Sequence, residues 1–191
     1  HVLGGVLFDL GGYEGARKRF SRGLDLYRRL GSRKGEADCL RSLGDVAGVL
    51  GVPDEACSLF EDALEIYRTV GSGPYVADVL GRLGTFHGEL SHFDVAIECL
   101  EEAHGVFKRL GDVEGVAGAL FKLGSVLHNC GELKGARKHL RKALKIQRDL
   151  EASGALADTL AHLGAVYEGL GDLKGARDCY SESLEIRREL S

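Results

Sequence analysis

A period of forty residues is the feature of this 191-residue sequence that most constrains its fold. The pair Leu-Gly recurs at positions 3–4, 43–44, 83–84, 123–124 and 163–164. Alanine recurs at positions 16, 56, 96, 136 and 176 and again at 37, 77, 117 and 157, and a large apolar residue recurs at 20, 60, 100, 140 and 180. Because the spacing never changes, the chain is a tandem array of one structural unit.

Each unit contains two helical patterns. In the second unit, small and apolar residues lie three and four positions apart, first at Ala37, Leu40, Leu43, Gly44, Ala47 and Leu50, and then at Ala56, Phe60, Ala63, Leu64 and Tyr67. Gly51 and Pro53 separate the two patterns, since glycine ends helices and proline suits a first helical turn. In the last junction, residues 151–155 lack the glycine that opens the others. We therefore expect a tighter or more helical turn there.

Small residues in register indicate close helix packing. Gly44 and Ala56 fall where the two helices of a unit meet, and only a minimal side chain lets two backbones approach closely. A glycine inside a helix costs about 1 kcal/mol relative to alanine, so its recurrence indicates a packing gain. Further glycines at positions 15, 35, 115, 135 and 175 fall in first helical turns. There we expect them to be tolerated because helix ends fray easily.

These columns resemble the tetratricopeptide repeat, or TPR. The residues that match in order and spacing are Leu40, Leu43, Gly44, Ala56, Phe60 and Ala63. The family's usual aromatic residue in the first helix survives only as Tyr167, and its usual final proline is absent. The period is forty rather than about 34 residues. The sequence is thus similar to the long-repeat branch, which includes Leu-Gly-Asn repeat adaptors and kinesin light chains.

The resemblance implies an all-α, right-handed α-solenoid of about five helical hairpins. We expect one array over residues 1–191, with repeats at approximately 1–30, 31–70, 71–110, 111–150 and 151–191, the first of them truncated. The sequence begins without Met, and no polar capping helix follows its last repeat. Because solenoids need capped ends, we expect a piece of a longer protein or ends that pack on something else.

In this family the first helices line a concave groove that binds a peptide or a partner helix. Helical spacing from the Leu-Gly pairs places these candidate groove residues on the outward side of the first helices: Asp38, Arg41, Ser42, Asp45, Asp78, Arg82, Thr85, Glu89, Lys122, Ser125, His128, Asn129, Asp158, His162 and Glu168. Such a mixed lining suits a peptide with charges of both signs. The alternative for any one of these residues is an ordinary solvated helix face.

Two binding modes of the family cannot be transferred to this sequence. The Leu-Gly-Asn adaptors hold peptide backbones with the asparagine of that triplet, but here the third residue is Gly5, Asp45, Thr85, Ser125 or Ala165. The chaperone-binding members use a set of Lys and Asn residues to hold a terminal carboxylate, and no unit shows that set. The expected ligand is therefore neither of those two.

Charge distinguishes the second helices from one another. Residues 11–30 carry six basic and two acidic residues, residues 131–150 carry seven and two, and residues 51–70 carry one and five. The basic group Arg137, Lys138, Arg141, Lys142 and Lys145 could meet an acidic protein, a nucleic acid or a lipid, or could be solvated surface. It lacks the interleaved aromatic residues that stack on bases, and the net charge is only −4. Nucleic acid is therefore not the expected partner.

Composition and motifs favour a non-enzymatic protein. No apolar run approaches the roughly 18 residues of a membrane span, and no nucleotide, nucleophile or metal motif occurs in its required context. We expect no cofactor, no metal and no small-molecule substrate. The five cysteines form no CxxC pair, which favours reduced thiols and a cytoplasmic location.

The predicted function is a protein-interaction scaffold that binds a partner's peptide or helix in the concave groove. Two alternatives remain at this point. The array could be a regulatory, peptide-sensing module of a larger signalling protein, or a structural array that associates with itself through uncapped ends.

Overall fold

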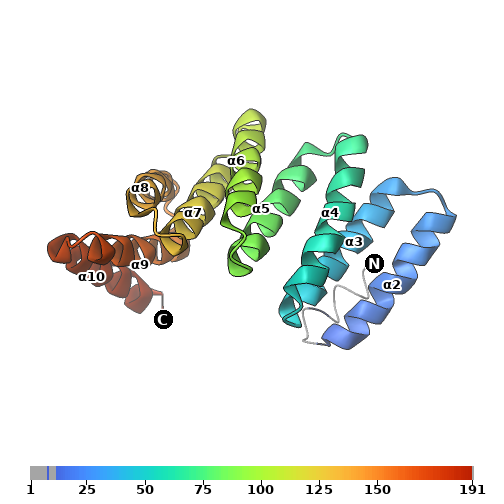
Figure 1. The fold of residues 1–191 in the computed structure, drawn as a ribbon, viewed down its shortest axis with the longest axis horizontal. Helices are drawn as coiled ribbons and strands as arrows, with labels where there is room; N and C mark the ends of the chain where they lie inside the picture. Colours follow the sequence, from blue (N-terminus) through green and yellow to red (C-terminus); the bar gives the residue numbers. More distant parts are fainter. Residues whose placement is uncertain (1–7, 9–11, 191) are drawn as a thin grey trace. The chain divides into compact units, whose positions relative to one another are not determined.

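The computed structural model describes residue 8 and residues 12–190, and all the regular structure in that part of the chain is helical. The helices are α2 (Tyr13–Arg29), α3 (Arg33–Val49), α4 (Pro53–Thr69), α5 (Gly73–Glu89), α6 (Phe93–Leu110), α7 (Val113–Asn129), α8 (Leu133–Asp149), α9 (Ser153–Gly169) and α10 (Leu173–Glu189) (Figure 1). The predicted first helix of repeat one, which contains Leu3 and Gly4, lies outside the described residues, as does Gly5. Of the described helices, none has the length and hydropathy needed to cross a bilayer.

The chain divides into two compact units. Unit 1 is His1–Leu90 and contains α2 to α5, and unit 2 is Ser91–Ser191 and contains α6 to α10. Within each unit, every helix packs against the next one along the chain. We call α3, α5, α7 and α9 the first helices, and α2, α4, α6, α8 and α10 the second helices. This succession of paired helices is the all-α repeat architecture that the forty-residue period predicts.

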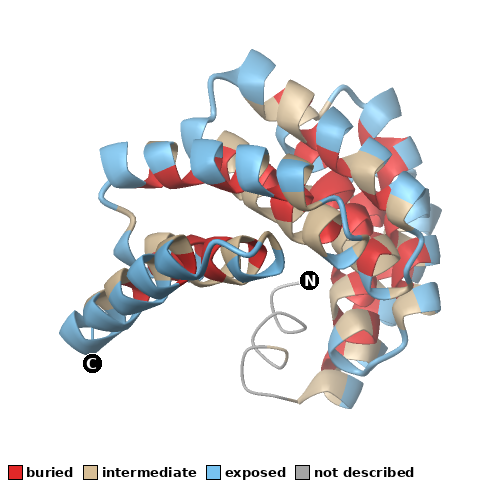
Figure 2. Cartoon of the chain, turned by 60° about the vertical axis from the view of Figure 1, so that its left-hand side comes forward, coloured by how far each residue is buried: buried red, intermediate tan, exposed pale blue. Residues whose placement is uncertain are grey.

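The recurring alanines lie at the contacts between helices. In the first alanine column, positions 16, 56, 96 and 136 are fully buried and Ala176 is 4% exposed, and the alanines at 37, 77, 117 and 157 are at most 3% exposed. The large apolar column beside them is buried too, from Phe20 to Leu140, although Tyr180 is 40% exposed. Buried residues accordingly follow the sides of the helices that face their neighbours (Figure 2). The predicted packing role of the small residues is confirmed.

Glycines at the helix contacts let aromatic rings approach the backbone. A Cβ atom at Gly44 would lie 2.7 Å from the Phe60 ring. At Gly35 and Gly115 it would lie only 2.4 and 2.3 Å from the rings of Tyr27 and Phe107, on the preceding second helix. The expectation that first-turn glycines are merely tolerated at frayed ends is therefore wrong at these two positions. Both glycines receive a ring from the helix before them.

The turns between helices share one geometry at intervals of twenty residues. One residue in each turn from α2 to α10 has a positive φ angle, at the first position after α6 and at the second position after the other helices, and it is glycine at 31, 51, 71, 111, 131 and 171. Ser91 and Glu151 adopt the same left-handed conformation, with φ of 62° and 53°. The expectation of a tighter or more helical turn at residues 151–155 is therefore wrong. Hydrogen bonds from Glu151 N to Arg148 O and from Ala152 N to Gln147 O fix the usual turn there.

Replacing Glu151 with glycine is expected to stabilise the protein. A non-glycine residue pays about 1–2 kcal/mol in the left-handed region, so Glu151→Gly should raise the free energy of unfolding by about 1 kcal/mol in a urea titration. The matched control is Glu185→Gly, an exposed position inside α10, which should lose about 1 kcal/mol. A loss at both positions would contradict the assigned turn.

Candidate functional site

The first helices of unit 1 carry a network of opposite charges. Arg82 on α5 bonds Asp45 on α3, and its Nε donates to Asp78 Oδ2 at 3.1 Å. Arg41 on α3 lies 3.8 Å from Asp45 and 3.7 Å from Asp78. The sequence predicted these four residues on one surface, and the structure brings them into contact across two helices. They are partly buried, so each pair is stronger than a fully solvated one.

Burial also affects the ionisation of this network. It raises the pKa of the Asp45 carboxyl, while the neighbouring Arg82 and Arg41 guanidinium groups act in the opposite direction. Because the net direction is upward, the carboxyl is protonated more readily than a solvated aspartate. Arg82 and Arg41 favour the charged form of the Asp45 carboxyl.

Tyr67 of α4 holds another of the candidate groove residues, Asp38 of α3. Its hydroxyl donates a 2.6 Å hydrogen bond to Asp38, and the side chain is fully buried. Burial raises the pKa of the Tyr67 hydroxyl, and the hydrogen bond to Asp38 adds to that effect. The tyrosine therefore stays protonated and fixes the orientation of the Asp38 carboxylate. The sequence pattern predicted Tyr67 only as a core residue, and this role was missed. A signal was available, because the hydroxyl of a buried tyrosine usually needs a hydrogen-bond partner.

A cavity of about 420 Å³ opens beside the charged network in unit 1. Its lining includes Asp45 and Val49 of α3, Arg82 and Phe86 of α5, and Glu89 at the end of α5, together with Phe8 and Gly48. Gly48 makes room for Phe86, because a Cβ atom there would lie 2.3 Å from the ring. The lining of the cavity thus combines an aromatic side chain with one cation and two anions. The sequence analysis identified the charged residues but neither Phe86 nor Gly48.

Two predicted groove residues use their hydroxyls within their own helices. Ser42 is 6% exposed and donates to Asp38 O at 2.9 Å, and Thr85 donates to Gly81 O at 2.9 Å. The placement of Ser42 on the outward surface is therefore wrong, because helical spacing turns it toward the packed side. Thr85 stays partly exposed.

In unit 2 the candidate residues lie on α7 and α9. Lys122, Ser125 and His128 are partly exposed, and Asn129 is exposed at the end of α7. On α9, His162 packs edge-on against Phe121 of α7, with ring centroids 4.8 Å apart.

Two acidic candidates of α9 contact the second helix of their own repeat. Asp158 accepts a 2.7 Å hydrogen bond from Arg187, and Glu168 accepts one of 3.2 Å from Tyr180, both on α10. These carboxylates therefore already have cationic or hydroxyl partners. In the described part of the chain, no group of three or more His, Cys, Asp or Glu residues is arranged to hold a metal ion.

The comparison with known proteins identifies the repeat. The model of the tetratricopeptide repeat family matches residues 47–109 and 115–189. The chain belongs to the tetratricopeptide repeat family. The buried alanine and glycine columns described above are thus the helix contacts of its TPR units. No curated protein sequence matches the chain.

Solved structures share the TPR architecture at low sequence identity. BtubC (BKLC) from P. vanneervenii is 24% identical, with a TM-score of 0.90 over 99% of this chain and 78% of that one. A putative kinesin light chain from Podosopora anserina with nearly identical TPR-like repeats is 15% identical, with a TM-score of 0.81 over 100% and 94%. Aspartyl phosphate phosphatase F from Bacillus subtilis is 14% identical, with a TM-score of 0.86 over 98% and 49%. At these identities the likeness concerns the fold alone.

Proposed function

We propose that this TPR chain is a non-enzymatic interaction scaffold and that the first-helix surface of unit 1 binds a segment of a partner protein. The observation that supports this most is the cavity beside the charged network, whose lining combines Phe86 with Arg82 and the carboxylates of Asp45 and Glu89. An apolar surface with a few fixed polar groups is the usual composition of a binding site. TPR repeats in general serve protein interactions, which agrees with this surface.

The charges around the cavity define the partner that fits. A side chain placed against Phe86 would meet Arg82 and Glu89 in the same cavity lining, so a segment with an apolar residue flanked by both charge signs is complementary. Because Arg82 already bonds Asp45 and Asp78, the network is held in place before a partner arrives. Such pre-organisation lowers the entropic cost of binding.

Self-association is the second candidate function, and one observation favours it. On α10, the exposed fractions of Leu173, Tyr180 and Leu184 are 71%, 40% and 48%. Leu140 and Leu144, which precede the last two by forty residues, are 0% and 8% exposed because the next first helix covers them. The apolar side of α10 is therefore built like a surface that another helix covers.

Glu89→Lys is expected to weaken binding of a partner at the first-helix surface of unit 1 without lowering the melting temperature. Glu89 is exposed at the end of α5, so the change does not disturb the core. A partner identified by pull-down and mass spectrometry would be purified and titrated, and the change should reduce its affinity roughly tenfold. Arg82→Glu is a poorer test, since it would place a third carboxylate beside Asp45 and Asp78 and destabilise α5.

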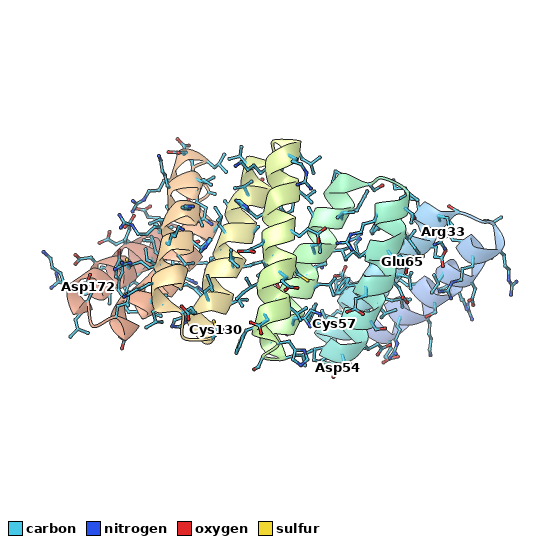
Figure 3. The ribbon with its side chains drawn as sticks, turned by 45° about the horizontal axis from the view of Figure 1, so that its top comes forward. Arg33, Asp54, Cys57, Glu65, Cys130 and Asp172 are labelled. Carbon is cyan, nitrogen blue, oxygen red and sulfur yellow. The ribbon has the colours of Figure 1, made fainter. Side chains whose placement is uncertain are left out.

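The matched control is Glu65→Lys, the same charge reversal at an exposed position of α4, the helix on which Figure 3 labels Asp54 and Glu65. This control should leave the affinity unchanged. Equal losses for Glu65→Lys and Glu89→Lys would contradict the choice of surface. A mass that rises with concentration in light scattering would favour self-association instead.

A further inference from the structure

The second helix α8 concentrates positive charge that the protein itself does not neutralise. Between Lys134 and Arg148 it carries seven lysines and arginines, all exposed, against the single acidic residue Asp149. Among the described residues, Arg148 is the one α8 cation with an ion pair, to Glu182 of α10 at 2.6 Å. The second helices of the neighbouring repeats do not share this feature, because α6 carries four acidic and two basic residues and α10 carries four of each.

This arrangement disfavours the helix on its own. Lys134 and Lys138, Arg137 and Arg141, and Arg141 and Lys145 are like-charge pairs four residues apart, a spacing at which equal charges destabilise a helix. The positive surroundings also reach two histidines. Burial lowers the pKa of His139 on α8, and the adjacent lysines lower it further. Burial and neighbouring lysines act in the same way on the pKa of His104 on α6. The surface therefore attracts anions more strongly than the net charge of the chain suggests.

A cavity of about 440 Å³ lies next to these cations. Its lining contains Arg141, Lys145 and Arg148 of α8, Tyr167 of α9 and Cys179 of α10. The lining also contains Leu144, Leu160 and Leu163, so an apolar floor lies beside the positive wall, and Asp149 and Glu182 complete it. An apolar lining next to several cations is the composition expected of a binding site rather than of an ordinary solvated helix.

We propose that the cavity between α8 and α10 binds an acidic protein segment that carries a large apolar side chain. Carboxylates of the segment pair with Arg141 and Lys145, and the apolar side chain enters beside Leu144 and Tyr167. The apolar floor favours a protein segment over a nucleic acid or an anionic lipid surface, because the lining holds three leucines that can contact an apolar side chain and a single aromatic residue, Tyr167, on which bases could stack. This site lies on second helices and is independent of the first-helix surface proposed above.

The test uses the full chain and a fluorescein-labelled peptide, Asp-Glu-Asp-Leu-Phe-Glu-Asp-Glu, titrated by fluorescence polarisation at low salt. The double variant Arg141→Glu with Lys145→Glu should weaken binding roughly tenfold or more. It should not lower the melting temperature, since it removes the repulsion within α8. A peptide with alanine in place of Leu-Phe should bind several-fold more weakly than the original, because the floor of the cavity is apolar.

The matched control is Lys174→Glu with Arg188→Glu, two exposed cations of α10 outside the cavity lining, which should change the affinity by less than about twofold. Equal losses for the two double variants would overturn the proposal in favour of general charge attraction. So would the absence of peptide binding, or tighter binding of an oligodeoxythymidine strand or of phosphatidylserine vesicles.

The alkylation rates of three cysteines can show whether the peptide binds in this cavity. Cys179 lines the cavity and is partly exposed, and Cys99 and Cys130, which are also partly exposed, do not line it. Burial raises the pKa of the Cys179 thiol, so alkylation with iodoacetamide is carried out at mildly alkaline pH. Bound peptide should slow alkylation of Cys179, measured by peptide mass mapping, and leave Cys99 and Cys130 unchanged. Equal protection of all three, or of none, would contradict the site.

Discussion

Phe60→Ala is expected to lower the free energy of unfolding by about 3–5 kcal/mol, the usual range for removing a fully buried phenylalanine. The ring is 0% exposed, lies against the backbone at Gly44 and stacks on Phe86 with centroids 5.8 Å apart. Its removal leaves a cavity where α3 and α4 meet, and the short glycine cannot fill it. Urea denaturation followed by circular dichroism at 222 nm measures the change.

The control lies in the same column of the repeat. Tyr180 is the residue that corresponds to Phe60 three repeats later, and its ring packs on Gly164 in the same way. Because Tyr180 is 40% exposed, Tyr180→Ala should cost only about 1–2 kcal/mol. If the two substitutions cost the same, burial would not be what makes this column stabilising. The m values should be compared as well, since repeat arrays can unfold in segments.

Ala136→Leu is expected to destabilise unit 2 by about 1–3 kcal/mol through overpacking. Ala136 is fully buried on α8, and its carbonyl oxygen lies 3.3 Å from the position of a Cβ atom on Gly124 of α7. Three additional carbon atoms cannot fit between backbones at this separation, so α7 and α8 must move apart. The same urea titration detects the loss, and a binding assay for a first-helix partner should change little.

Ala155→Leu is the matched control, because Ala155 is exposed on α9 of the same unit. This change should leave the free energy of unfolding within about 0.5 kcal/mol of the original value, as surface substitutions usually do. A large loss at Ala155 would mean that the added volume, rather than its position, is harmful. A small loss at Ala136 would contradict the close helix approach.

The fold could be predicted from the sequence because its packing rule is repeated. One alanine in one helix says little, but Ala56, Ala96 and Ala136 in the same register indicate a contact that every repeat makes, and all three are fully buried. Two expectations about the fold were wrong, the one about the turn at residues 151–155 and the one about the first-turn glycines, and both depend on local packing or backbone conformation. Glu151 adopts a left-handed conformation that its side chain does not favour, and Gly35 is small because Tyr27 needs the space.

The candidate surfaces were harder to predict, because their features occur once. The Arg41 and Arg82 network depends on side-chain reach between two helices, which spacing along one helix cannot give. Ser42 was misplaced, since a position between two faces of a helix can turn either way. Phe86 and its cavity depend on Gly48, whose column repeats glycine only at Gly88 and has His128 and Glu168 in the later repeats. Such features require coordinates.

The evenly spaced left-handed residues restrict how a chain of this kind can change length. They divide the sequence into segments of twenty residues, and the segments alternate between the two kinds of helix. Deleting one residue inside a helix would rotate the side chains that follow it in that helix by about 100° and turn part of its packed side away from its neighbours. Duplicating a single segment would place two helices of one kind in succession. Gene duplication can therefore lengthen such an array without loss only in steps of forty codons.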